Sequence, residues 1–198
     1  MKRPELVFGL VGAVGTNLTE VSHKLAEAIE TVGYEVHQIR LSEEINEFKK
    51  YENDKYKIDE YQRIQDSMNK GDEIRKHTGE ASAVAILGIT RIKLIRKEKR
   101  SENNDENSPI YNTAYIINSL KRPEEIDTLK YIYEENFVPI SVFCPEEMRI
   151  ENLKTRIAKS KNTTKKEGFY ECAKDLIKRD QKDENENFGQ NVRKTFPM

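Results

Sequence analysis

Residues 5–19 of the chain read Glu-Leu-Val-Phe-Gly-Leu-Val-Gly-Ala-Val-Gly-Thr-Asn-Leu-Thr. The first part, Glu5 to Gly12, is a short apolar run that ends at a glycine, as in a parallel strand that is buried on both faces. A helical pattern follows at once, and Asn17 and Glu20 have the spacing of a capping box at its start. The stretch therefore predicts a central strand, a glycine turn and a helix.

Apolar runs and helical patterns alternate through the rest of the chain. They predict strands over 34–41, 111–117 and 137–143, and helices over 17–32, 79–100 and 169–177, with further helices opening at Pro123 and Pro145. This alternation predicts an α/β fold with a three-layer parallel sheet and ligands at the carboxyl ends of the strands.

The charged residues gather in segments outside these elements. Residues 42–79 are crowded with Lys, Glu, Asp and Asn, and we expect exposed helices there, lying over the sheet. We expect one domain over 1–198, in which 42–108 is a helical insertion with a polar loop and 178–198 is a polar tail without a regular pattern.

Composition excludes several classes of protein. The 198 residues include 34 Lys and Arg against 35 Asp and Glu, so the net charge of -1 gives no global basic field for nucleic acid. No run of about 18 apolar residues occurs, so we expect a cytoplasmic protein with neither a membrane span nor a signal peptide. The two cysteines, Cys144 and Cys172, form no Cys-x-x-Cys pair, and the three histidines form no zinc pattern. We expect no zinc in this chain.

The glycine turn is the strongest candidate for a site. A strand that runs through such a turn into a helix presents backbone N–H groups and a helix N-terminus to one point, and phosphate is the usual ligand there. The predicted phosphate-binding residues are Gly12, Ala13, Val14, Gly15, Thr16, Asn17, Leu18 and Thr19. A tight turn with glycines for packing alone is the alternative.

Two phosphate-binding patterns fit the turn incompletely. The dinucleotide fingerprint needs a glycine where Leu10 stands. The Walker A pattern, started at Gly12, finds its hydroxyl at Thr19 but has Leu18 in the lysine slot, and Asn118 follows the third strand where a Walker B aspartate is expected. Because phosphoryl transfer depends on such charges, we expect binding of ATP or a deoxynucleotide with little or no kinase activity. The need for Mg²⁺ stays open.

Arginines supply further candidate contacts. Arg122 precedes a helix that Pro123 opens, and we expect it to contact phosphate, with a surface pair to Glu124 or Glu125 as the alternative. Later residues stand where nucleoside monophosphate kinases have lid and base contacts. These candidates are Arg179, Asp180, Gln190 and Arg193.

Three segments together resemble the N-terminal P-loop kinase-like region of the anti-phage deoxycytidine nucleotide deaminases. They are Gly-Leu-Val-Gly-Ala-Val-Gly-Thr-Asn-Leu at 9–18, Ile-Asn-Ser-Leu-Lys-Arg-Pro-Glu-Glu at 117–125, and Arg-Asp at 179–180 followed by Phe-Gly-Gln-Asn-Val-Arg-Lys-Thr-Phe at 188–196. The resemblance covers nearly the whole chain. It implies a nucleotide-binding part in which Leu18 is a family trait, with a regulatory or sensory role in antiviral defence.

The resemblance also implies a second part, a zinc deaminase acting on dCTP or dCMP. Its His-x-Glu and Pro-Cys-x-x-Cys signatures do not occur in this chain. We therefore expect either a longer natural protein that continues beyond Met198 into such a deaminase domain, or a stand-alone relative.

Three functions follow as hypotheses. The first is a regulatory nucleotide-binding domain, which is compatible with a homo-oligomer. The second is an active deoxynucleoside monophosphate kinase that recruits a lysine from elsewhere in the chain, such as Lys121. The third is an interaction scaffold without a ligand.

Overall fold

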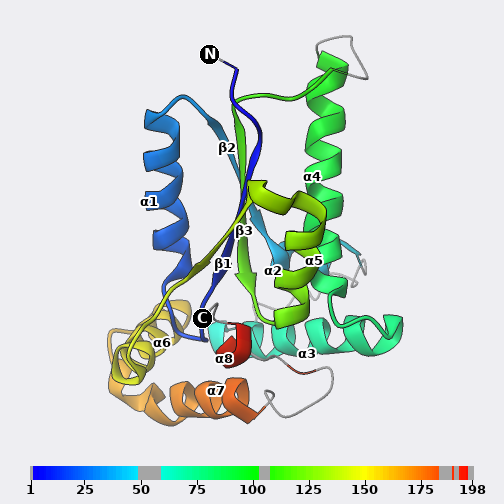
Figure 1. Cartoon of the computed structure of the whole chain (residues 1–198). Coiled ribbons are helices and arrows are strands. Elements are labelled where there is room, and N and C mark those ends of the chain that lie inside the picture. The colour runs from blue at the N-terminus through cyan, green and yellow to red at the C-terminus, as the bar shows by residue number, and fades with distance from the viewer. Residues whose placement is uncertain (1, 49–58, 103–107, 183–188, 190–191, 196–198) are drawn as a thin grey trace.

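The computed structural model describes residues 2–48, 59–102, 108–182, 189 and 192–195. In this part of the chain four strands form one parallel sheet in the order β2-β3-β1-β4 (Figure 1). The strands are β1 (Leu6–Val11), β2 (Glu35–Arg40), β3 (Thr113–Leu120) and β4 (Phe137–Ser141). The prediction of an α/β fold with a parallel sheet and a central first strand is confirmed.

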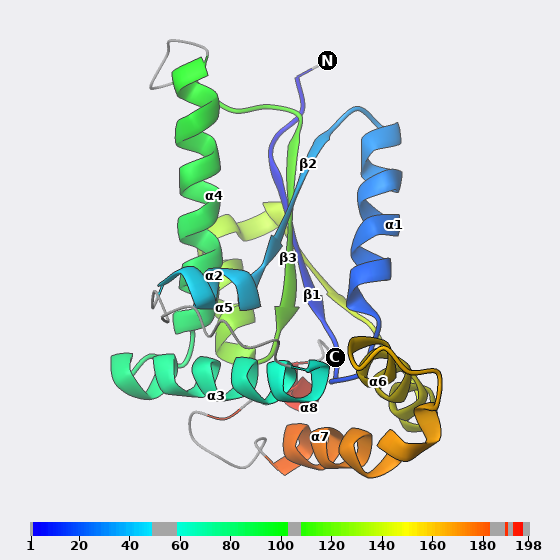
Figure 2. The same cartoon turned by 180° about the vertical axis from the view of Figure 1, so that it is seen from behind.

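Helices cover both faces of the sheet and its carboxyl edge. Helix α1 covers one face, α2, α4 and α5 cover the other, and α3, α6 and α7 lie beyond the carboxyl ends of the strands (Figures 1 and 2). Their bounds are α1 (Leu18–Thr31), α2 (Leu41–Phe48), α3 (Glu60–Thr78), α4 (Ala83–Glu102), α5 (Pro123–Tyr133), α6 (Glu146–Ser160), α7 (Tyr170–Lys182) and α8 (Val192–Thr195). Short 3₁₀ turns occupy Glu134–Asn136 and Lys166–Phe169.

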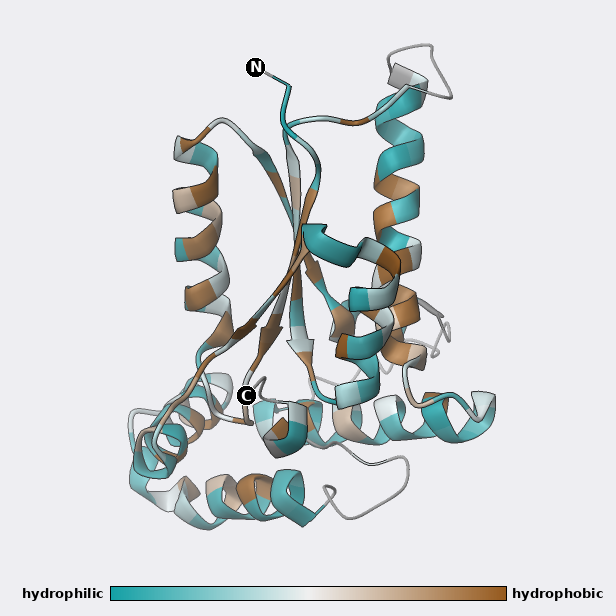
Figure 3. Cartoon of the chain, viewed as in Figure 1, coloured by the Kyte–Doolittle hydropathy of each residue, from teal (hydrophilic) through white to brown (hydrophobic). Residues whose placement is uncertain are grey.

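The two faces of β3 show how the sequence builds this arrangement. Ala114 and Ile116 pack in the cluster under α1, whereas Tyr115 and Ile117 pack in the larger cluster under α2, α4 and α5. Successive side chains of a strand point to opposite faces, so a strand covered on both sides must be apolar throughout. In Figure 3 the apolar residues follow the strands and the first half of α4, and the last half of α4 is hydrophilic.

Gly9 in β1 is required by packing. A Cβ at this position would lie 2.6 Å from Leu120 Cδ1 and 2.8 Å from the Phe137 ring. These two large side chains from the neighbouring strands fill the space that Gly9 leaves. The glycine in the first apolar run therefore belongs to the core and not to the turn.

Two expectations need correction. Residues 59–79 do not form an exposed helix over the sheet: α3 crosses the carboxyl edge and buries Ile64, Met68 and Ile74. The polar tail is also more regular than predicted, because α7 continues to Lys182 and Val192–Thr195 forms α8. In both segments the apolar residues are few, and they bury against elements distant in sequence. The rest of the predicted tail, apart from Gly189, lies outside the described residues.

Within the described ranges, no helix is long and apolar enough to cross a membrane.

Candidate functional site

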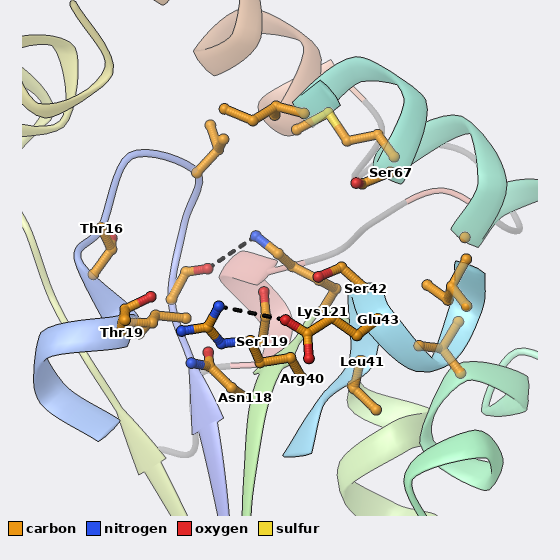
Figure 4. A pocket seen from close by; sticks show the side chains of 18 of the residues that line it. Thr16, Thr19, Arg40, Leu41, Ser42, Glu43, Ser67, Asn118, Ser119 and Lys121 are labelled. Atoms are coloured by element: carbon orange, nitrogen blue, oxygen red, sulfur yellow. Dashed lines mark hydrogen bonds and ion pairs between the residues drawn. The ribbon is translucent and has the colours of Figure 1, made fainter. Parts of the chain in front are cut away.

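A pocket of about 600 Å³ opens at the carboxyl edge of the sheet, where the chain leaves β1 and β3 (Figure 4). All eight predicted turn residues, 12–19, contribute to its lining, together with Asn118, Ser119 and Lys121 from the end of β3. The chain turns to α1 on one face after β1 and to α5 on the other face after β3. Such divergence between adjacent parallel strands creates the crevice in which α/β proteins bind ligands.

The two glycines of the turn are held by close contacts. Gly15 has φ +86°, and a Cβ there would lie 2.7 Å from the Arg149 carbonyl oxygen. A Cβ on Gly12 would lie 2.8 Å from Leu18 Cδ2. The turn therefore packs tightly on both α6 and the start of α1, and its backbone is fixed before any ligand arrives.

The backbone N–H groups of the turn are only partly used. Those of Val14, Thr16 and Leu18 donate to Asp180 Oδ2 at 2.8 Å, Ala13 O at 3.0 Å and Thr16 O at 2.9 Å. Among the described residues no acceptor is found for the N–H groups of Gly15, Asn17 and Thr19. The hydroxyl of Thr16 is buried and likewise without a hydrogen-bond partner there. Asn17 and Thr19 are exposed, so their N–H groups are open to a ligand, and an unpaired buried hydroxyl such as that of Thr16 is rare in proteins.

Leu18 stands in the lysine slot of the Walker A pattern, but the cation at the turn is Lys121. Leu18 is buried and packs against Leu10 and Ala26 in the cluster under α1. The ammonium of Lys121 instead reaches the turn from the loop between β3 and α5 and donates to Gly12 O at 3.0 Å (Figure 4). The Lys121 side chain is 14% exposed and lies 3.6 Å from Asp180 Oδ1. The side chain of Leu18 thus contributes packing, and the positive charge beside the turn comes from Lys121.

Ser119 is a strained residue at the mouth of the site. The register of β1 with β3 shifts between Leu10 and Val11, so that Asn118 and Leu120 pair with them and Ser119 is the extra residue. Its φ is +80°, in the left-handed region that disfavours a side chain. Such strain is concentrated at functional sites. No motif in the sequence marks Ser119, and the predicted site residues do not include it.

Four arginines from two helices and a strand end line the pocket besides Lys121. They are Arg40, Arg63, Arg75 and Arg156. Glu43, which pairs with Arg40 at 3.4 Å, is the one carboxylate among the described lining residues. No motif marks these arginines, and those of α3 and α6 meet Arg40 only when the two helices lie across the carboxyl edge. The lining therefore carries an excess of positive charge.

Glu60 joins two of these arginines behind the lining. It pairs with Arg63 at 2.6 Å and with Arg156 of α6. Burial opposes its ionisation, but the hydrogen bonds and charges of Arg63 and Arg156 outweigh burial and lower the pKa of the Glu60 carboxyl. One carboxylate between two guanidinium groups leaves a net positive charge at the pocket.

Glu125 connects the loop that carries Lys121 to α3. Its side chain is fully buried, and Oε1 accepts from Arg75 Nη2 at 2.8 Å. Oε2 accepts from the N–H of Lys121 at 2.7 Å and from that of Arg122 at 3.2 Å. One carboxylate thus fixes two lining residues, Lys121 and Arg75.

The structure does not bring Arg122 to the pocket. Its guanidinium is buried, donates to the Gly189 carbonyl and pairs with Glu124 at 2.9 Å. Arg122 has extended backbone angles, so its side chain points away from that of Lys121. The predicted phosphate contact is therefore replaced by the alternative pair with Glu124, and the adjacent Lys121 faces the pocket.

The other predicted lid and base contacts have different positions. Arg179 of α7 donates to Asn69 Oδ1 of α3 at 2.6 Å and is not a lining residue. Asp180 is buried and binds the turn from behind through Val14. Gln190 and the side chain of Arg193 lie outside the described part of the chain.

Among the described residues, no group of three or more His, Cys, Asp or Glu side chains is placed to hold a metal ion. In comparisons with known proteins, no family model matches the chain, and no curated protein is significantly similar to it.

Proposed function

We propose that this chain binds a nucleotide at the glycine turn and acts as a regulatory P-loop-like domain with little or no kinase activity. The observation that carries the proposal is the pocket itself, whose lining includes all of residues 12–19. The open N–H groups of Gly15, Asn17 and Thr19 at the start of α1 suit a phosphate, which helix N-termini favour.

The remainder of the pocket suits the rest of a nucleotide. Its volume lies in the range of small-molecule sites, roughly 300–1,000 Å³. The arginines offer further contacts for anionic oxygens. Apolar side chains from α2, α3 and α4 offer a surface for a base, namely Leu41, Ile45, Ile64, Met68 and Val84.

The resemblance to the anti-phage deoxycytidine nucleotide deaminases supports dCTP and dCMP as the first ligands to test, with ATP beside them. An antiviral regulatory role is part of the same proposal. The finding of a His-x-Glu and a Cys-x-x-Cys segment downstream in the natural gene would support this relationship.

The test is isothermal calorimetry with dCTP, dCMP and ATP on the wild type and on two charge-matched variants. Thr19 is exposed and lies in the first turn of α1, where an acidic side chain favours the helix. Thr19→Glu should therefore fold, yet its carboxylate should repel phosphate and weaken binding at least tenfold. Thr31→Glu, at the other end of α1 and outside the pocket lining, should bind within twofold of the wild type. Equal affinity in Thr19→Glu and the wild type would exclude the glycine turn as the site.

A kinase is the second candidate, and the position of Lys121 at Gly12 favours it. A coupled assay of ADP release with dCMP and ATP decides between the two functions. Turnover above background would establish the kinase, whereas binding without turnover would leave the regulatory role. If no nucleotide raises the melting temperature, the scaffold hypothesis holds, because ligand at about 100 times Kd adds roughly 2.7 kcal/mol.

A further inference from the structure

We propose that Lys121, positioned by Asp180, supplies to the bound phosphate the positive charge that the glycine turn lacks. This inference rests on the proposed nucleotide site and assigns two residues to it. Lys121 is the ligand-contacting residue, and Asp180 acts through Lys121 as a positioning residue.

The position of the ammonium carries the first half of the inference. Lys121 Nζ lies 3.0 Å from Gly12 O, at the first residue of the turn, and Lys121 is one of the residues that line the pocket. An ammonium has three N–H donors, and the contacts to Gly12 and Asp180 leave donor capacity for a phosphate oxygen. Leu18, in the lysine slot of the turn, carries no charge, and its side chain packs in the core.

The placement of Asp180 carries the second half. Asp180 is 3% exposed, and its Oδ2 holds the Val14 N–H at 2.8 Å. Its Oδ1 makes no hydrogen bond with the described residues and lies 3.6 Å from Lys121 Nζ. A buried carboxylate needs a compensating charge, and Lys121 supplies one. The same side chain therefore fixes a backbone point of the turn and orients the ammonium beside it.

The backbone of Lys121 is held as firmly as its side chain. The carboxylate of Glu125 accepts its N–H at 2.7 Å and is itself bound by Arg75 of α3. Lys121 is thus fixed at both ends before a ligand binds, which reduces the ordering cost of contact with phosphate.

The experiment measures how the loss of Lys121 depends on the number of phosphates. Lys121→Met keeps most of the apolar stem and removes the charge, and Lys121→Arg restores a cation. The probes are dCTP, dCDP and dCMP, with ATP, ADP and AMP as a second series. The matched control is Lys130→Met, at an exposed position of α5, the helix that follows the Lys121 loop, and Lys130 does not line the pocket.

We expect Lys121→Met to weaken triphosphate binding at least tenfold, which corresponds to about 1.4 kcal/mol. The loss should be smaller for monophosphates, and Lys121→Arg should recover most of the affinity. Lys130→Met should bind like the wild type. If Lys121→Met binds triphosphates within twofold of the wild type while Thr19→Glu does not bind, the site stands and the role of Lys121 is refuted. If the wild type binds neither nucleotide series, both the site and this inference fail.

A double-mutant cycle tests the positioning role of Asp180. Asp180→Asn keeps an oxygen that can accept the Val14 N–H but removes the charge that faces Lys121. We expect Asp180→Asn to change triphosphate affinity at least threefold when Lys121 is present and to have no effect in the Lys121→Met background. A purely structural role would give the same change in both backgrounds, and that additive result would overturn the assignment.

Discussion

The packing of the fold and the position of Lys121 both depend on the buried side chain of Glu125. Removing this side chain should therefore have a large effect on stability. Glu125→Ala deletes the ion pair with Arg75 and the acceptor for the N–H groups of Lys121 and Arg122. Breaking a buried ion pair costs about 3–5 kcal/mol. Arg75 keeps its pair with Asp72 at 3.2 Å, so we expect a total loss of about 4 kcal/mol in the free energy of unfolding, including about 1 kcal/mol from the cap of α5.

Urea unfolding at neutral pH measures this loss as a change in midpoint at constant m-value. The expected decrease in melting temperature is about 8–16 °C for a chain of this size. The control is Asp127→Ala, at an exposed position of the same helix, which should stay within about 0.5 kcal/mol of the wild type. A loss below about 1 kcal/mol for Glu125→Ala would show that the Arg75 pair does not hold the loop after β3, and the account of how Lys121 is positioned would fail with it.

Three further predictions concern other parts of the site. Gly15→Ala should lower the free energy of unfolding by about 1–2 kcal/mol, because φ is +86° and the new Cβ would lie 2.7 Å from Arg149 O. The control is Gly168→Ala, whose Cβ meets nothing within 4 Å and which should not destabilise the protein. Equal urea midpoints for the two variants would refute the strained turn. Ser119→Gly should raise the free energy of unfolding by about 1 kcal/mol, or the melting temperature by about 2–4 °C, because glycine removes the steric strain of a side chain at φ +80°. An unchanged melting temperature would argue against strain at this position. The pKa of Glu60 in the folded state lies below its ordinary value of 4.5, so its carboxylate stabilises the protein above pH 4.5 and loses this effect as pH falls through the lowered pKa. The melting-temperature gap between the wild type and Glu60→Gln should therefore be present at pH 7 and close only as pH falls through that lowered pKa. A gap independent of pH would contradict the charge pairing.

The sequence predicted the elements whose local pattern is strong. The apolar run before Gly12, the Asn17 cap and the helix opening at Pro123 are each encoded within a few residues, and the structure has the strand and both helices there. Segments with weak periodicity were interpreted less well. The apolar residues of α3 are widely spaced among charged ones, and only contact with α6 and α7 shows that they form a core.

The lining of the candidate pocket was predicted where it lies in one continuous stretch and missed where it is assembled from distant segments. The turn residues 12–19 were predicted as a group and all line the pocket. Arg122 was chosen over its neighbour Lys121, although in extended backbone only one of two successive side chains can face the site. The arginines of α3 and α6 carry no motif, so nothing in the sequence distinguished them from solvated charges.

The proposed function requires that a nucleotide phosphate binds the N–H groups of the glycine turn. The most direct measurement is a titration of the isotope-labelled protein with dCTP and with ATP, followed by amide chemical shifts. We expect the amide signals of Gly15, Asn17 and Thr19 to move with added nucleotide and to saturate at the affinity found by calorimetry, while those at the far end of α1 stay in place. If the signals of the turn do not move while the ligand binds elsewhere, or if no signal moves at all, the glycine turn is not a phosphate site.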